Sequence, residues 1–325
     1  MKLRVAVVYG GRSGEHEISI RSAESIIRAL DPEKYKVLHY FISKEGKWRP
    51  RPIVPEPGGN PEIDVVFPIL HGTFGEDGTV QGMLELAELP YVGSGVLASS
   101  LAMDKEMTKR VCAAAGIPVV EYRIVHRGQF DLDALESALP YPMFVKPANL
   151  GSSVGISKAH NRAELEAALT LASQFDYKVI VERGVAGREF ECAVLGNEDP
   201  QASIPCEILP SREFYDYEDK YILNQAKTVL PTDLIPSQSD GMRQIAVDAY
   251  KAVGCEGMAR VDFLLEAHSG EMFINEINTI PGFTSISMYP KMWEATGVSY
   301  TELVDRLIRL ALERHKIRRA NRYTR

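Results

Sequence analysis

The sequence has little of what marks secreted, zinc-binding or membrane proteins. Four cysteines occur among 325 residues, and no two of them form a C-x-x-C pair: Cys112, Cys192, Cys206 and Cys255. Neither a disulfide scaffold nor a zinc knuckle is indicated, so we expect a reduced, cytoplasmic protein. The sequence also lacks the roughly 18 consecutive apolar residues of a membrane span, and its first apolar run is too short for a signal peptide. No membrane partner is therefore expected.

An excess of basic residues is also missing. The chain carries 37 lysines and arginines against 44 acidic residues, which gives a formal net charge of −7. This balance gives no reason to expect a nucleic-acid partner. Apolar residues make up 45% and charged residues 25%, a composition that excludes a disordered or collagen-like chain and fits a globular protein of more than one domain.

The first hundred residues alternate between strand and helix patterns. Residues 5–9 form an apolar run that ends at Gly10-Gly11, as expected of a buried parallel strand that enters a tight turn. Apolar residues at helical spacing follow over 23–30, and a second strand is predicted at 37–42. This β-α-β start predicts a doubly wound α/β domain, which we place at residues 1–103.

The pattern changes after a helix that is predicted to begin near residue 104. Short strands with one helix at 163–172 follow, at 144–146, 155–158, 178–182 and 189–195. We therefore place two smaller α+β domains at 104–188 and 189–325. The last one ends in a helix with leucines on one face.

A glycine-rich turn follows the first strand. Its sequence, Gly-Gly-Arg-Ser-Gly over 10–14, is not G-x-G-x-x-G, and no acidic residue ends the second strand. Both departures count against a nicotinamide-dependent oxidoreductase. The turn still places Glu15 at the carboxyl end of a strand, where small ligands bind in α/β proteins. The alternative is an acid that merely complements the dipole of the following helix.

A second glycine loop runs from Lys146 to Gly155, between two predicted strands. It has neither the G-K-[ST] ending nor the following helix of a P-loop. Its glycines would let backbone amides approach phosphate oxygens, Ser152 and Ser153 would add hydroxyl donors, and Lys146 would add charge. A plain hairpin turn is the alternative.

Acidic residues on two predicted strands carry the sharpest signal. If the turn between these strands is centred on Ser269, Asp262 faces Glu276 and Arg260 faces Asn278. Side chains alternate along strands, so all four would lie on one face. Two facing carboxylates repel each other unless a cation lies between them, and hard oxygen ligands suit Mg²⁺, above all with phosphates nearby. The sequence therefore predicts a magnesium site, because an exposed polar face explains this pattern poorly.

Taken in order, these segments resemble the D-alanine–D-alanine ligase family, whose members have the ATP-grasp fold. The resemblance covers nearly the whole chain. It rests on the residues at 10–19, 71–79, 93–95, 103–105, 145–147, 151–155, 214–221 and 278–282.

The resemblance implies an N-terminal doubly wound α/β domain followed by the two α+β subdomains of an ATP-grasp fold, with a lid loop at about 211–227. It implies a two-step reaction for peptidoglycan synthesis. ATP phosphorylates the carboxylate of one D-alanine, and the amine of a second D-alanine then displaces the phosphate. ATP, two Mg²⁺ ions (with Mn²⁺ as a possible substitute) and a homodimer are expected.

One set of residues is assigned by this resemblance to the nucleotide and the metal ions. Phosphate contacts are expected from Lys105, Lys146, Ser152, Ser153 and Lys220, adenine contacts from Glu182, Arg183 and Val185, and a ribose contact from Glu189. The metal ligands are expected to be Asp262, Glu276 and Asn278.

A second set is assigned to the amino acids. Glu15 and His71 match residues that hold the first D-alanine, and Arg260 with the Gly282 amide matches the oxyanion site. Ser287, Met288 and Lys220 match the pocket for the second carboxylate, and Glu15, Ser152 and Tyr221 match a hydrogen-bonded catalytic chain. Some relatives carry lysine in place of Arg183 and leucine in place of Met288.

Three other functions are compatible with parts of the sequence. A non-catalytic ATP sensor would be favoured by the loss of a metal ligand, but all three are present. A Rossmann-type oxidoreductase lacks its fingerprint. A D-alanine–D-lactate ligase would share most of the motifs, and Tyr221 favours an amine acceptor over it, because ester-forming relatives depart from tyrosine here.

Overall fold

The computed structural model describes residues 2–210 and 227–322. The expected lid at 211–227 lies outside the described residues apart from Lys227, and so do Lys220 and Tyr221. In the described part of the chain, no helix is long and apolar enough to cross a membrane.

The N-terminal sheet has the strand order β3-β2-β1-β4. Its strands are β1 (Leu3–Gly10), β2 (Tyr35–Ile42) and β4 (Val65–Pro68), which are parallel, and β3 (Trp48–Arg49), which is antiparallel to β2. Residues 5–8 are completely buried, which explains the unbroken apolar run. The connection α1 (His16–Ala29) packs against β1. The β-α-β prediction is confirmed; α2 (Thr79–Leu86) and α3 (Val96–Met103) were not predicted.

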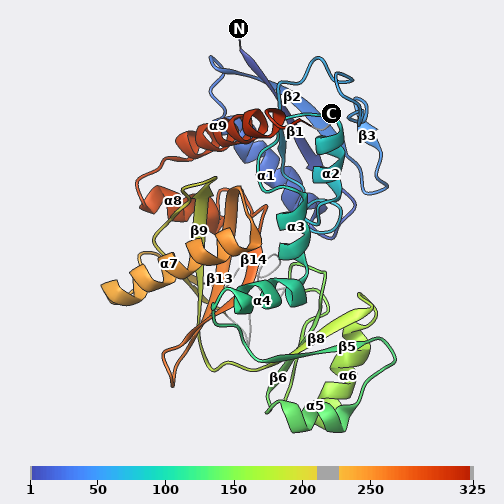
Figure 1. Cartoon of the computed structure of the whole chain (residues 1–325), viewed down its shortest axis with the longest axis vertical. Helices are drawn as coiled ribbons and strands as arrows, with labels where there is room; N and C mark the ends of the chain where they lie inside the picture. The colour runs from blue at the N-terminus through green and yellow to red at the C-terminus, as the bar shows by residue number, and fades with distance from the viewer. Residues whose placement is uncertain (1, 211–226, 323–325) are drawn as a thin grey trace.

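The central sheet has the order β5-β8-β6-β7 and is antiparallel throughout. Its strands are β5 (Tyr122–His126), β6 (Met143–Pro147), β7 (Ser157–Ala159) and β8 (Lys178–Arg183). It is covered by α5 (Leu132–Ala138) and α6 (Arg162–Ala172), which form the lower right lobe of Figure 1. Leu165, Leu169 and Val181 are buried between these layers, so the small lobe has its own core.

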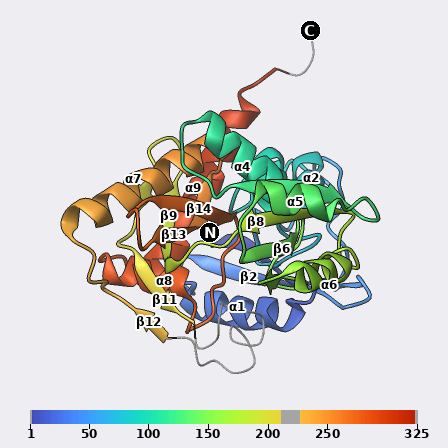
Figure 2. The ribbon, with the colours of Figure 1, turned by 90° about the horizontal axis from the view of Figure 1, so that it is seen from below.

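The C-terminal sheet has the order β12-β11-β9-β13-β14, with β10 (Gln201–Ala202) beside β9. Its strands are β9 (Gly187–Gly196), β11 (Cys206–Leu209), β12 (Lys227–Val229), β13 (Gly257–Glu266) and β14 (Met272–Asn278). The helices around it are α4 (Lys105–Ala114), α7 (Pro236–Val253), α8 (Met288–Ala295) and α9 (Tyr300–Arg319). The long strands β9 and β13 pair along their whole length and form the middle of this sheet (Figure 2).

Each sheet lies within one of the predicted domains, apart from the first two residues of β9. The predicted boundaries themselves stay a prediction, because the packing crosses them. Val5 and Phe67 of the N-terminal sheet share one core with Tyr289 and Leu307, and α9 lies against the N-terminal sheet beside α1 in Figure 1.

The end of α9 is fastened to the N-terminal region by Arg314. This arginine is 4% exposed, donates to the carbonyl oxygens of Tyr91 (2.9 Å) and Gly93, and stacks on the Tyr91 ring at 4.2 Å. One turn later, Arg318 pairs with Glu85 and Glu256. The basic end of the helix is therefore partly used within the fold.

We expect Arg314→Met to destabilise the protein by about 2–4 kcal/mol, because two buried carbonyls lose their donor and the nearby Glu256 carboxylate keeps Arg318 alone of its two arginines. The free energy of urea unfolding measures this. Arg319→Met on the same helix is the matched control, because its exposed pair with Glu88 at 3.7 Å should contribute less than about 0.5 kcal/mol. Equal effects of the two variants would contradict the anchoring role.

Candidate active site

A cavity opens between the central sheet and the C-terminal sheet. Its apolar lining comes from both sheets and includes Phe144, Ile156, Phe190, Ile208 and Phe263. The lining also contains most residues that the sequence assigned to nucleotide and metal, namely Lys105, Lys146, Ser153, Glu182, Arg183, Val185, Glu189, Asp262 and Glu276. An apolar cleft with a few convergent charges is what a small ligand with a planar and an anionic part requires.

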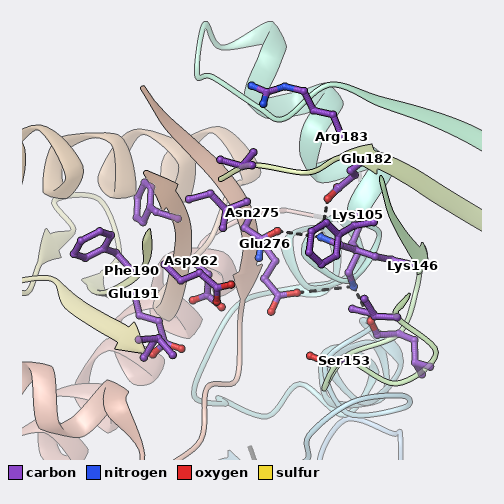
Figure 3. A pocket seen from close by; sticks show the side chains of 18 residues that line it. Lys105, Lys146, Ser153, Glu182, Arg183, Phe190, Glu191, Asp262, Asn275 and Glu276 are labelled. Atoms are coloured by element: carbon purple, nitrogen blue, oxygen red, sulfur yellow. Dashed lines mark hydrogen bonds and ion pairs between the residues drawn. The ribbon is translucent and has the colours of Figure 1, made fainter. Parts of the chain in front are cut away.

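Two lysines face the cavity from its central-domain side (Figure 3). Lys105 is the first residue of α4, whose start is fixed because the Asp104 side chain accepts from the Glu106 and Met107 amides. Its ammonium donates to the Leu150 carbonyl at 2.6 Å and lies 3.9 Å from Glu276. The sequence thus places one lysine where the glycine loop and the acidic hairpin meet.

The second lysine belongs to a buried ionic triad. Lys146 on β6 lies 2.6 Å from the Glu182 carboxylate, and Lys109 lies 2.9 Å from its other oxygen. Burial alone would raise the pKa of Glu182, but the two ammonium groups lower it to about 2. Lys109 is not among the residues predicted from the sequence, although its spacing of four from Lys105 places both on one face of a helix.

The acidic hairpin has the predicted pairing at its functional end. Asp262 faces Glu276 and Arg260 faces Asn278. The register then shifts, so that Asn275 is an extra residue and the turn is not simply centred on Ser269. Such bulges re-aim side chains, and the Asn275 amide oxygen accepts from Lys146 at 3.2 Å (Figure 3).

Charge in the hairpin is unevenly balanced. Arg260 donates twice to Asp262, at 2.7 and 2.6 Å, and lies 3.3 Å from Glu191, while Asn278 donates to Asp262 at 3.1 Å. Burial raises the pKa of Asp262 to about 7 even though Arg260 opposes this shift. Glu276 also faces this cluster and lies 3.9 Å from Lys105, so three carboxylates gather around Arg260 and the more distant Lys105.

A divalent cation would relieve this imbalance. Asp262, Glu276 and Asn278 offer the hard oxygen atoms that Mg²⁺ prefers. Within residues 2–210 and 227–322, no group of three or more His, Cys, Asp or Glu side chains could hold a metal ion. Magnesium commonly binds one or two carboxylates and takes its other ligands from substrate phosphates and water, so this donor set fits it.

Glu15 is not part of the cavity lining, but its carboxylate lies close to the glycine loop. A Cβ atom built on Gly72 would be 3.0 Å from its carboxylate oxygen, and one on Gly151 would be 3.6 Å away. Ser13 fixes the turn before it, by accepting from the Glu15 amide at 3.2 Å and donating to the His71 carbonyl at 2.7 Å. The predicted neighbours Glu15, His71 and the glycine loop are therefore brought together.

The His71 ring is engaged by the protein at both nitrogens. Nδ1 lies 3.0 Å from the Ile280 carbonyl and Nε2 lies 3.2 Å from the Ser22 hydroxyl. Burial lowers the pKa of His71, so the ring is neutral, donates from Nδ1 and accepts at Nε2. Because Ser22 also accepts from the Phe283 amide at 3.2 Å, this pair positions the segment that contains Gly282.

The remaining predicted residues of the amino-acid site lie beside that segment. A Cβ atom on Gly282 would be 2.8 Å from the Ser287 hydroxyl, which accepts from the Thr284 amide at 3.0 Å. Met288 begins α8 and packs against the main core. Gly282 and Ser287 are thus neighbours, as an amino-acid subsite built from both would need.

Two further findings change the sequence-based picture. Glu76, which received no role, accepts from the Gly72 amide at 2.8 Å, and burial and the nearby Glu15 charge raise its pKa well above the usual range. The Arg183 guanidinium pairs with Glu266 at 2.7 Å and stacks on Phe273 at 5.2 Å, so its charge serves the fold.

Comparisons with known proteins agree with this geometry. A family model described as D-ala D-ala ligase C-terminus matches residues 111–309, and one described as D-ala D-ala ligase N-terminus matches 4–56 and 54–94. The chain belongs to the D-alanine–D-alanine ligase family. The predicted family and the predicted fold class are thereby confirmed.

Individual relatives match over almost their whole length. A D-alanine–D-alanine ligase of Solibacter usitatus is 64% identical over 100% of both chains, and D-alanine–D-alanine ligase A of Escherichia coli K12 is 47% identical over 97% of both. The solved ligase of Coxiella burnetii has a TM-score of 0.87 and 40% identity over 98% of this chain and 96% of its own. The VanG D-Ala:D-Ser ligase of Enterococcus faecalis has a TM-score of 0.87 and 36% identity over 96% and 100%.

The ionic triad predicts an acid-dependent stability. The folded-state pKa of Glu182 (about 2) lies below that of an unfolded glutamate (about 4.3), so its stabilising effect is complete above the unfolded value and is lost as pH falls through the folded one. We expect Glu182→Gln to cost about 3 kcal/mol at neutral pH and less between pH 4.3 and 2. Urea unfolding at several pH values measures this. The exposed Glu294→Gln serves as control, and a Glu182 effect that is constant with pH would refute the expectation.

Proposed function

We propose that this protein joins two D-alanines into D-alanyl-D-alanine for peptidoglycan synthesis, with conversion of ATP to ADP and phosphate. The observation that carries the proposal is that two lysines, Lys105 and Lys146, line the same cavity as the acidic pair Asp262 and Glu276. Such a pair of charged walls suits the transfer of a phosphoryl group, because the lysines would offset its negative charge on one side and cations held by the acidic pair would offset it on the other. Phosphorylation turns the poor leaving group of a carboxylate into a good one.

For the nucleotide, we propose that Lys105, Lys146 and the loop residues Ser152 and Ser153 bind the phosphates. Ser152 and Ser153 have φ angles of 55° and 57°, and a loop of this kind can turn successive backbone amides toward an anion. The adenine would lie at Glu182, Arg183 and Val185, with Arg183 contributing its backbone, and the ribose at Glu189. All four of these residues line the same cavity.

For the metal, we propose two Mg²⁺ ions, replaceable by Mn²⁺, with ligands from Asp262, Glu276 and Asn278. Bound there, the ions would neutralise phosphate charge and orient the phosphate that is transferred. Arg260 stays on the same hairpin face and would stabilise the tetrahedral intermediate together with the Gly282 amide.

For the amino acids, we propose that Glu15 and His71 hold the first D-alanine. The Glu15 carboxylate suits an ammonium group, and His71 acts by fixing the segment that contains Gly282. Ser287 and Met288, with Lys220, would bind the second carboxylate. We also propose a hydrogen-bonded series of Glu15, Ser152 and Tyr221, which is supported by the position of Glu15 beside Gly151. Lys220 and Tyr221 lie outside the described residues.

We further propose a cytoplasmic homodimer. All four cysteines are free and buried, which suits a reducing compartment. Large apolar side chains on neighbouring helices are exposed, namely Leu86 on α2 (65%) and Leu97 on α3 (69%), and exposed apolar groups of this kind are candidates for an interface.

We expect Glu276→Gln to lower turnover at least a hundredfold, because it removes a metal charge with almost no change in volume. The Mg²⁺ concentration for half-maximal activity should rise at least tenfold. Phosphate release at increasing Mg²⁺ measures both. Glu271→Gln at the other end of the hairpin is the control for folding. Wild-type turnover of Glu276→Gln, or full activity of the unchanged protein in excess chelator, would rule out the metal site.

We expect dipeptide as the main product when D-alanine and D-lactate compete. The second D-alanine must lose its ammonium proton before it attacks, so its use should rise toward alkaline pH, while D-lactate should gain little. Chromatography of the products at pH 7 and 8 measures the ratio. Predominant ester at pH 8 would mean that the chain is a D-alanine–D-lactate ligase. Formation of D-alanyl-D-serine in the presence of D-serine would test for the activity named for the Enterococcus relative.

A further inference from the structure

Lys109 is a buried lysine that the reaction does not use directly. It lies on α4, one turn after Lys105, and its side chain is 1% exposed. It is not among the residues that line the nucleotide cavity, and its ion pair is with Glu182, which does line it. Burial lowers the pKa of Lys109, and the charge of Glu182 opposes this shift. A charge is rarely kept in such a place unless a partner requires it.

That partner is Glu182, which has two lysines for one carboxylate. Lys109 lies 2.9 Å from one oxygen and Lys146 lies 2.6 Å from the other. The two lysines are not equivalent, because Lys146 lines the cavity and also donates to Asn275 at 3.2 Å. Lys146 can therefore turn to an anion in the cavity, whereas Lys109 cannot.

We propose that Lys109 is the permanent counter-ion of Glu182, which lets Lys146 leave the carboxylate and bind ATP phosphate without leaving a buried charge unpaired. The inference rests on the proposed roles of Lys146 and Glu182 in nucleotide binding. Lys109 is a positioning residue, because it acts through Glu182 and touches neither substrate nor metal.

The surroundings of Glu182 define what happens without Lys109. The titratable and charged groups that face this cluster are Lys109 and Cys112 on α4, Lys146 on β6 and Tyr122 on β5. Lys109 and Lys146 are the cations among them. If Lys109 is removed, a carboxylate that is 2% exposed must keep Lys146 or take up a proton when ATP binds. ATP binding then becomes coupled to proton uptake.

The test uses Lys109→Met in the full-length protein. Binding of ATP with Mg²⁺, in the absence of D-alanine, is measured by calorimetry from pH 6 to 9 and expressed as a ratio to wild type, so that the titration of ATP itself cancels. We expect weaker binding by at least tenfold at pH 8, and a ratio that worsens with rising pH by up to tenfold per unit. The KM for ATP should rise while the KM for D-alanine stays within about twofold.

Two further variants separate charge compensation from packing. Lys178→Met is the matched control, because Lys178 pairs with Asp104 and Glu106 at the start of the same helix but not with Glu182, and its ratio should be flat with pH. In a Glu182→Gln background, Lys109→Met should change ATP affinity much less, because the charge that needed it is gone.

The outcomes are distinguishable. A ratio for Lys109→Met that is flat with pH, or an equal loss of affinity in the Glu182→Gln background, would overturn the counter-ion role. The proposed function would still stand in that case, provided that the wild type binds ATP. Failure of the wild type to bind ATP would overturn both. If Lys109→Met does not fold, a folded double variant supports charge compensation, and a double variant that also fails to fold overturns it.

Discussion

The pairing of β13 with β14 is the constraint on which the rest of the site depends. It holds the Asp262 and Glu276 carboxylates face to face and places Arg260 opposite Asn278. Side chains alternate along a strand, so a slip of one residue would turn this set away from the cavity. The pairing of β13 with β9, which continues over ten residues, holds β13 itself in register. The stability of the C-terminal sheet therefore maintains the positions of these charged side chains.

The same hairpin shows where sequence reasoning succeeds and where it stops. The functional end could be predicted because the strand period is fixed and two acids at matching positions are conspicuous. The bulge at Asn275 could not, because an extra residue between Ile274 and Glu276 leaves no mark in the apolar pattern. Only the structure shows that Asn275 reaches Lys146.

Buried charges were the other residues that escaped prediction. Lysine is normally exposed, and Lys109 is buried because a strand far along the chain brings Glu182 against it. The uncharged Ser22 was missed for the same reason, since its partner His71 lies in another segment, whereas Glu76 accepts from Gly72 within one turn. The docking of α9 on the N-terminal sheet also depends on contacts between distant segments, such as Arg314 with Gly93. Local patterns predicted the elements, and these long-range pairs determine how the elements meet.

The glycine loop explains how one site can serve both a nucleotide and an amino acid. The Leu150 carbonyl accepts from Lys105, the backbone at Gly151 lies beside Glu15, and Ser153 lines the nucleotide cavity. Four consecutive residues therefore join the proposed phosphate site to the proposed D-alanine site. A Cβ on Gly155 would come within 2.6 Å of Phe175, so the loop's far end is packed closely and leaves its position little freedom. Because the loop would touch both proposed ligands, a displacement at either end would move the carboxylate and the phosphate that must meet, so the proposed transfer requires a closely held loop.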